Sequence, residues 1–172
     1  MNCKEPSHCV RYQRMDTTIP TVDSPQVIAP PPLIFLGGLA IGITLHWLKP
    51  LPFLPENVPL PLGVALIAIS VLLVVTAIRA FIKAKTNIDV RKPTTSIVVT
   101  GPYRFTRNPI YLSMALLVLG IAVWMNESWI LMALLPVLML IRFGVIAREE
   151  AYLTEKFGAE YLEYKSKVRR WL

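Results

Sequence analysis

The residues best suited to chemistry lie in the stretch GPYRFTRNPIYLS, residues 101–113. In this stretch Arg104, Arg107 and Asn108 stand directly before an apolar run. Asn108 followed by Pro109 predicts the N-cap and first position of a helix, because the first helical turn leaves its N–H groups unpaired and proline has none. Those free N–H groups and the positive end of the helix dipole would lie beside the two arginines. The stretch therefore predicts a site for an anionic group.

A second group of ionisable residues lies near the C-terminus. Glu149 and Glu150 follow an apolar run, and Arg142 lies about two helical turns earlier, within that run. An ionisable group in an apolar segment is costly unless it faces a polar cavity or reaches the surface along its own aliphatic chain. A carboxylate can hold an amino group or hydroxyls, and an arginine can pair with a carboxylate through two N–H groups. Arg107, Arg142 and Glu149 are the candidates for catalysis.

The elements that must position these residues are apolar. The chain has 172 residues, of which 54% are hydrophobic and 17% charged, and its mean hydropathy is +0.52. These values are typical of a membrane protein. A helix needs roughly 20 apolar residues to cross a hydrocarbon core of about 30 Å. About four segments approach this length, which predicts an all-α integral membrane protein with spans at Leu33–Leu48, Leu60–Ile82, Pro109–Met125 and Ser128–Ile146.

The distribution of the net charge of +7 predicts orientation and does not indicate nucleic-acid binding. Basic residues gather between the second and third spans and after the fourth, whereas the loops Lys49–Pro59 and Asn126–Glu127 have almost none. Since basic loops stay in the cytoplasm, we expect both termini, the long central loop and the candidate site on the cytoplasmic side of the membrane. The same rule offers a simpler interpretation of Arg104 and Arg107 as interfacial anchors.

Two further segments should adopt structure on the cytoplasmic side. The loop Lys85–Arg107 is too long for a minimal connection and too rich in isoleucine, valine and tyrosine for a flexible linker, so it should fold against another element. The tail Arg148–Trp171 repeats apolar and aromatic residues at helical spacing, interrupted at Gly158. It predicts an amphipathic C-terminal helix on the membrane surface or over the ends of the spans.

The N-terminal region has no such pattern. Residues 1–29 mix proline with small polar residues, which predicts a disordered tail ahead of a single domain at 30–172. No apolar segment of a signal peptide precedes Pro30, and Met15 is an alternative start to Met1.

Several chemistries are excluded by missing motifs. Cys3, His8 and Cys9 fall in the N-terminal tail, but a structural zinc site needs four ligands, so we expect no metal. The sequence has no glycine-rich phosphate loop after a strand, no HExxH and no Gly-x-Ser-x-Gly, which argues against metal-dependent hydrolysis and serine chemistry.

Two sequence blocks carry a resemblance to a known family. The first reads TN-x-D-x-RKPTT-(x4)-TGPYRFTRNPIY, and after a helical hairpin the second reads EE-x2-L-x3-FG-x2-Y-x2-Y. In this order, over roughly half of the chain, they resemble the bacterial branch of the isoprenylcysteine carboxyl methyltransferase family. That family lies within a wider group of membrane methyltransferases that includes phospholipid N-methyltransferases.

The resemblance to the bacterial branch implies a bacterial inner membrane, and the family implies a pocket for S-adenosylmethionine within about residues 85–172. Arg107 and Glu149 match the family's two motifs, one in each block. The residues implied in cofactor binding are Tyr103, Arg104, Asn108, Pro109, Tyr111, Glu150, Tyr161 and Tyr164. The sequence departs from the family at Asn108, where eukaryotic members more often have histidine, and in its ending VRRWL. It also has Val145 where a family arginine is usual, with Arg142 and Arg148 as the nearest cations.

The function implied is methyl transfer to a lipidic or prenylated acceptor among membrane lipids. Carboxyl O-methylation is the first interpretation, with Arg107 or Arg142 positioning the acceptor carboxylate. Methylation of a phospholipid amine is the alternative, and Glu149 would then be the base. A non-catalytic membrane protein that retains the fold stays open as a third.

Overall fold

The computed structural model describes residues 24–55, 58–87 and 92–171, so the predictions for Cys3, His8, Cys9 and most of the N-terminal tail lie outside the described residues. Within the described ranges the fold is all-helical and contains no strand. In chain order the elements are α1 (Pro31–Leu48), α2 (Pro59–Ala84), the 3₁₀ turn η1 (Gly101–Arg104), α3 (Pro109–Trp124), α4 (Ser128–Leu140), the π-helical turn η2 (Ile141–Ile146), α5 (Ala147–Phe157) and α6 (Ala159–Lys167).

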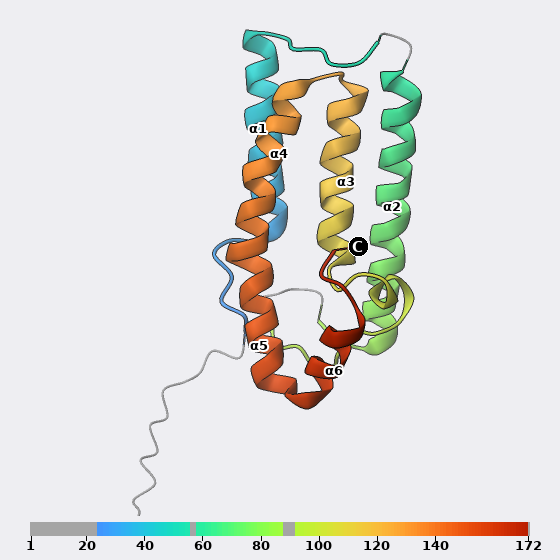
Figure 1. Cartoon of the computed structure of the whole chain (residues 1–172), viewed down its shortest axis with the longest axis vertical. Helices are drawn as coiled ribbons and strands as arrows, with labels where there is room; N and C mark the ends of the chain where they lie inside the picture. Colours follow the sequence, from blue (N-terminus) through green and yellow to red (C-terminus); the bar gives the residue numbers. More distant parts are fainter. Residues whose placement is uncertain (1–23, 56–57, 88–91, 172) are drawn as a thin grey trace, which may run out of the picture.

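The long helices form a bundle whose axes run side by side (Figure 1). Three helices are long and apolar enough to cross a membrane: α1, α2 and the continuous helix Ser128–Phe157. The shorter α3 has 16 residues, about 24 Å of helix, and packs against α1, α2 and α4. These findings establish an all-α membrane protein, and the expected count of four spans stays a prediction that depends on α3.

Glycines set how closely the helices approach. A β-carbon at Gly63 of α2 would lie 2.6 Å from the backbone of Trp124 in α3, and one at Gly42 of α1 would lie 2.7 Å from the Cα of Ile130 in α4. Small residues therefore bring backbones into contact, as expected where apolar side chains gain nothing by leaving lipid. A β-carbon at Gly37 would have nothing within 4 Å, so this glycine lies outside these contacts.

A polar cluster ties α1 to the α3–α4 hairpin at the end of the bundle far from α6. The carboxylate of Glu127, which is 1% exposed, accepts hydrogen bonds from His46 Nδ1 at 2.5 Å and from the backbone N–H of Leu51 at 3.1 Å. Burial opposes ionisation of Glu127, but these hydrogen bonds outweigh it and hold its pKa below the ordinary value. The expected tight hairpin at Asn126–Glu127 is confirmed, because α3 ends at Trp124 and α4 begins at Ser128.

The expected amphipathic helix Arg148–Trp171 is not a single element. The α4 helix continues through η2 into α5 without a break. The expected interruption at Gly158 is confirmed, with φ of 54° at this residue. The α6 helix ends at Lys167, so the expectation of a helix to Trp171 is wrong for its last residues. Residues 168–171 return to the start of α3 instead, where the backbone N–H of Arg107 donates to the carbonyl of Arg169 at 2.9 Å. The position of α5 and α6 on a membrane surface stays a prediction.

Candidate active site

A cavity of about 520 Å³ lies where the α1 and α3 N-termini meet the loop after α2, α5 and α6. Its volume is in the range of ligand-binding pockets. Predicted site residues from both sequence blocks line it together: Tyr103, Arg107, Asn108, Tyr111, Glu149, Glu150, Tyr161 and Tyr164. The fold therefore brings side chains of the two blocks to one cavity, and that this cavity binds a cofactor stays a prediction.

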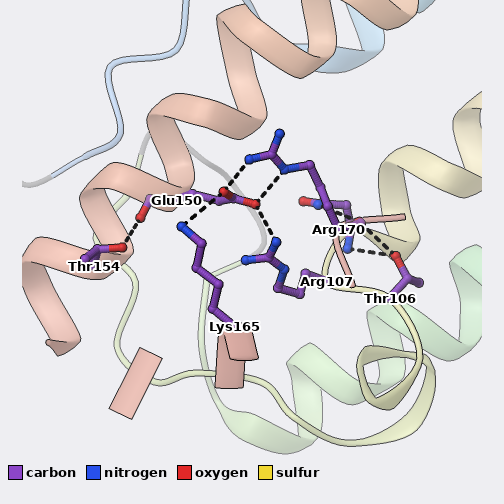
Figure 2. A network of polar contacts seen from close by, with 7 residues as sticks. Thr106, Arg107, Glu150, Thr154, Lys165 and Arg170 are labelled. Atoms are coloured by element: carbon purple, nitrogen blue, oxygen red, sulfur yellow. Dashed lines mark hydrogen bonds and ion pairs between the residues drawn. The ribbon is translucent and has the colours of Figure 1, made fainter. Parts of the chain in front are cut away.

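Glu150 is the centre of the charge network in this site (Figure 2). Its side chain is 7% exposed, and its carboxylate accepts two hydrogen bonds from Arg170, from Nε at 2.9 Å and from Nη2 at 2.7 Å. Arg107 Nη2 lies 3.3 Å from one carboxylate oxygen, and Lys165 Nζ lies 3.7 Å from the other. The carboxylate of Glu150 in α5 is thus surrounded by cations from three other places, the residues just before α3, the α6 helix and the C-terminal segment 168–171.

Arg107 keeps part of its hydrogen-bonding capacity free. Its side chain is 9% exposed, and its Nε and Nη1 atoms have no hydrogen-bond partner among the residues that the structure describes. A buried guanidinium N–H without a partner is costly, and the planar group is suited to bind a carboxylate. Since Arg107 also lines the cavity, its free N–H groups indicate a site for an anionic ligand group.

Tyr111 and Glu149 form a second polar pair in the cavity. The Tyr111 hydroxyl donates to Glu149 Oε1 at 2.7 Å, which joins the first turn of α3 to α5. Both side chains line the cavity, so the carboxylate of Glu149 is available to a ligand there. A carboxylate in this position can accept a hydrogen bond from an ammonium group or a hydroxyl.

Three further tyrosines support the cavity from η1 and α6. The Tyr164 hydroxyl donates to the backbone carbonyl of Tyr103 at 2.8 Å, and the Tyr161 and Tyr164 ring centroids lie 6.2 Å apart. Burial raises the pKa of Tyr161 to about 12 and raises those of Tyr103 and Tyr164 further. All three are therefore neutral at physiological pH, and all three line the cavity.

Arg170, in the C-terminal segment, belongs to the charge network around Glu150 and was missed by the sequence interpretation. Asn108 occupies the N-cap position of α3, but its side chain makes no cap hydrogen bond; its Nδ2 donates to the carbonyl of Arg170 at 3.0 Å. Thr106 Oγ1 donates to the same carbonyl at 3.1 Å. The altered ending VRRWL marked this segment as unusual, but no local pattern linked it to Glu150, 20 residues earlier.

Three predicted residues do not reach the cavity. Arg142 is exposed in η2, with its guanidinium 5.4 Å from the ring centroid of Phe143. Arg104 is exposed on η1, and Pro109 is buried at the first position of α3. Val145, at the position of the family arginine, is 0% exposed, and the cations that approach Glu150 are those described above.

The comparisons with known proteins identify the family. A model of the phospholipid methyltransferase family matches residues 58–160, which is more than half of the chain. The chain therefore belongs to this family and is a membrane methyltransferase by family. An uncharacterized protein from Haemophilus influenzae is 44% identical over 63 residues, which cover 37% of this chain and 100% of that protein. No solved structure matches the chain.

Proposed function

We propose that this protein transfers a methyl group from S-adenosylmethionine to a lipidic acceptor at the cytoplasmic membrane face. Carboxyl O-methylation of an isoprenylcysteine-like or other lipidic acceptor is the reaction we place first. The observation that carries this proposal is the buried guanidinium of Arg107, which lines the cavity with two nitrogen atoms free for a carboxylate, either that of the methyl donor or that of the acceptor. The family supports methyl transfer, and the two sequence blocks of the isoprenylcysteine methyltransferase type support the acceptor.

The residues of the cavity fit this methyl donor. S-adenosylmethionine supplies an electrophilic methyl group on a sulfonium cation, together with an amino-acid zwitterion and a ribose diol. The free N–H groups of Arg107 suit a carboxylate, and the carboxylate of Glu149 suits the amino group or the diol. The ring faces of Tyr111 and Tyr161 suit a cation, because aromatic faces attract positive charge.

The chain needs mainly to align the two reactants and exclude water. Methyl transfer is a direct displacement, in which the acceptor atom forms a bond to the methyl carbon while the bond from that carbon to sulfur breaks. A carboxylate acceptor brings its own electron pair and releases no proton, so this reaction needs no general base. Of the two arginines considered for the acceptor carboxylate, Arg107 lines the cavity, whereas Arg142 is exposed outside it.

Methylation of a phospholipid amine is the second candidate, and the family match favours it. An amine acceptor would lose a proton during methylation, and the carboxylate of Glu149 in the cavity is placed to receive it. The Tyr111 hydroxyl, at 2.7 Å, would keep that carboxylate oriented.

The test is calorimetric binding of S-adenosylmethionine to the detergent-purified protein, followed by transfer of a labelled methyl group to farnesylcysteine or phosphatidylethanolamine vesicles. We expect Arg107→Ala and Glu149→Ala to weaken donor binding about tenfold or more, since each removes a charged hydrogen-bonding group. Arg104→Ala is the matched control, because Arg104 is exposed and does not line the cavity. If Arg107 holds the acceptor instead, its substitution raises the acceptor KM and leaves donor affinity unchanged.

Each outcome decides a part of the proposal. Labelled farnesylcysteine supports O-methylation, and labelled phosphatidylethanolamine supports the second candidate. A folded wild-type protein that binds no donor would contradict both and leave a non-catalytic membrane protein that retains the fold.

A further inference from the structure

The segment before the first membrane helix, Ser24–Pro30, is docked against the π-helical turn η2 and the start of α5 (Figure 1). Arg148 Nη1 donates to the backbone carbonyl of Gln26 at 2.7 Å, and the backbone N–H of Ile28 approaches the carbonyl of Gly144 at 3.4 Å. Val27 packs against the main hydrophobic core. The segment is therefore held by contacts that lie more than 100 residues away in the sequence.

Gly144 provides the space for this docking. A β-carbon at Gly144 would lie 2.2 Å from Ile28 Cδ1 and 2.7 Å from Ile28 Cγ1, so the Ile28 side chain, which is 50% exposed, would have to leave its present rotamer. The Ile28 side chain thus occupies the volume that any other residue at position 144 would fill. Gly144 lies within a π-helical turn, a helix defect that is frequent at functional sites. The 3.4 Å backbone hydrogen bond is long, so the Arg148 hydrogen bond, the Val27 core contact and the Ile28–Gly144 contact hold the segment.

The docked segment and the first turn of α1 line the cavity with proline. Pro25, Pro30, Pro31 and Pro32 are all lining residues, and Pro25 and Pro31 are themselves buried. Proline has no backbone N–H, so it adds apolar surface without an unpaired donor. The charged and hydroxyl groups of the cavity come from the loop after α2, from α3, α5 and α6 instead. The cavity therefore has polar groups for a polar ligand group, and its apolar lining consists of this proline segment together with side chains such as Phe81 of α2 and Met114 of α3.

We propose that Ser24–Pro32 is the wall of the methyl-acceptor site that contacts the apolar chain of the acceptor, and that Gly144 positions it. This inference depends on the proposed function, because it assigns a role in recognising the acceptor. The family match begins at residue 58, so this wall lies outside the part that the chain shares with the family model.

The test displaces the wall without altering any group that would bind the donor. Gly144→Ala removes the space that the end of the Ile28 side chain occupies and so weakens the docking of the segment, while alanine is the better helix former, so the helix itself should not be weakened. Gly37→Ala is the matched control, since nothing lies within 4 Å of a β-carbon there. The double variant Gly144→Ala with Ile28→Ala restores the space and should recover part of the effect.

The expected result is a change in the acceptor KM without a change in donor affinity. For Gly144→Ala we expect an acceptor KM about tenfold higher, the effect of a lost apolar contact, with donor affinity by calorimetry unchanged. The preference among geranyl, farnesyl and geranylgeranyl cysteine analogues should also weaken. An acceptor KM equal to that of Gly37→Ala would overturn the proposal, and so would equal losses of donor affinity and acceptor affinity.

A measurement without turnover separates this proposal from the proposed function. Equilibrium binding of a fluorescent farnesylcysteine probe should weaken in Gly144→Ala and recover in the double variant. If the wild type binds this probe but no S-adenosylmethionine, the proposed function fails, whereas weaker probe binding in Gly144→Ala still supports the wall. If methyl transfer occurs and Gly144→Ala binds the probe normally, the wall is wrong and the proposed function stands. A folded wild type that binds neither compound overturns both.

Discussion

The charge network around Glu150 allows a quantitative prediction for Glu150→Gln. This change keeps the shape of the side chain and removes the negative charge that faces Arg107 and Arg170. Because the side chains of Glu150 and Arg107 are 7% and 9% exposed, water can replace little of the lost interaction. Removal of one partner from a buried ion pair costs about 3–5 kcal/mol.

The solvent exposure of the other two partners of Glu150 determines where in this range the loss of stability falls. The side chains of Arg170 and Lys165 are 31% and 40% exposed, so solvent screens their share of the loss. We therefore take the lower end, about 3 kcal/mol. For a chain of this size each kcal/mol shifts the unfolding midpoint by about 2–4 °C, which gives a decrease of about 6–12 °C.

The assay is thermal unfolding of the detergent-purified variants, followed by circular dichroism. Glu163→Gln is the control, because the Glu163 and Lys167 side chains are 69% and 68% exposed and their ion pair should contribute nothing measurable. Arg170→Gln should lower the midpoint less than Glu150→Gln does, since Glu150 then keeps Arg107. A midpoint for Glu150→Gln that matches the Glu163→Gln control would refute this account of the network.

Three other predictions concern different parts of the molecule. Because the pKa of Glu127 is held below its ordinary value of 4.5, the stability advantage of the wild type over Glu127→Gln should be complete above about pH 4.5 and decline below it, as measured by thermal unfolding across pH. Gly63→Ala should destabilise the α2–α3 contact by about 1–3 kcal/mol in denaturant unfolding, whereas Gly37→Ala should not destabilise. Tyr164→Phe removes the hydrogen bond to Tyr103 and should cost about 1 kcal/mol in the same assay; an unchanged stability would argue against that bond.

Much of the candidate site could be predicted because its residues lie in two local motifs. Residues 101–113 and Glu149–Tyr164 each carry their signal in a short stretch, and the cavity brings side chains from both together. Arg170 could not be found in this way. Its hydrogen bonds to Glu150 depend on the backbone bridge between Arg169 and Thr106, which lies just before α3. Such a long-range backbone contact leaves no periodic pattern in the sequence.

For Arg142 the local sequence pattern suggested a site residue that the fold leaves outside the cavity. An ionisable residue in an apolar run suggests a polar cavity, but the rotation of its helix decides which way it faces, and a single sequence cannot fix that rotation where the helix passes through a π-helical turn. The same turn brings Gly144 against Ile28, a contact between distant residues that the sequence could not indicate.

The sequence by itself determined the membrane class, the helical secondary structure, the hairpin at Asn126–Glu127 and the two motifs, because apolar length, charge and turn residues act locally. The tertiary structure alone decided which charges meet. It brought the side chains of Arg107 and Arg170 into ion pairs with Glu150 and left Arg142 outside the cavity. It also returned residues 168–171 to the start of α3. These outcomes depend on helix packing and on the cost of leaving a buried charge without a partner, and both are properties of the whole fold.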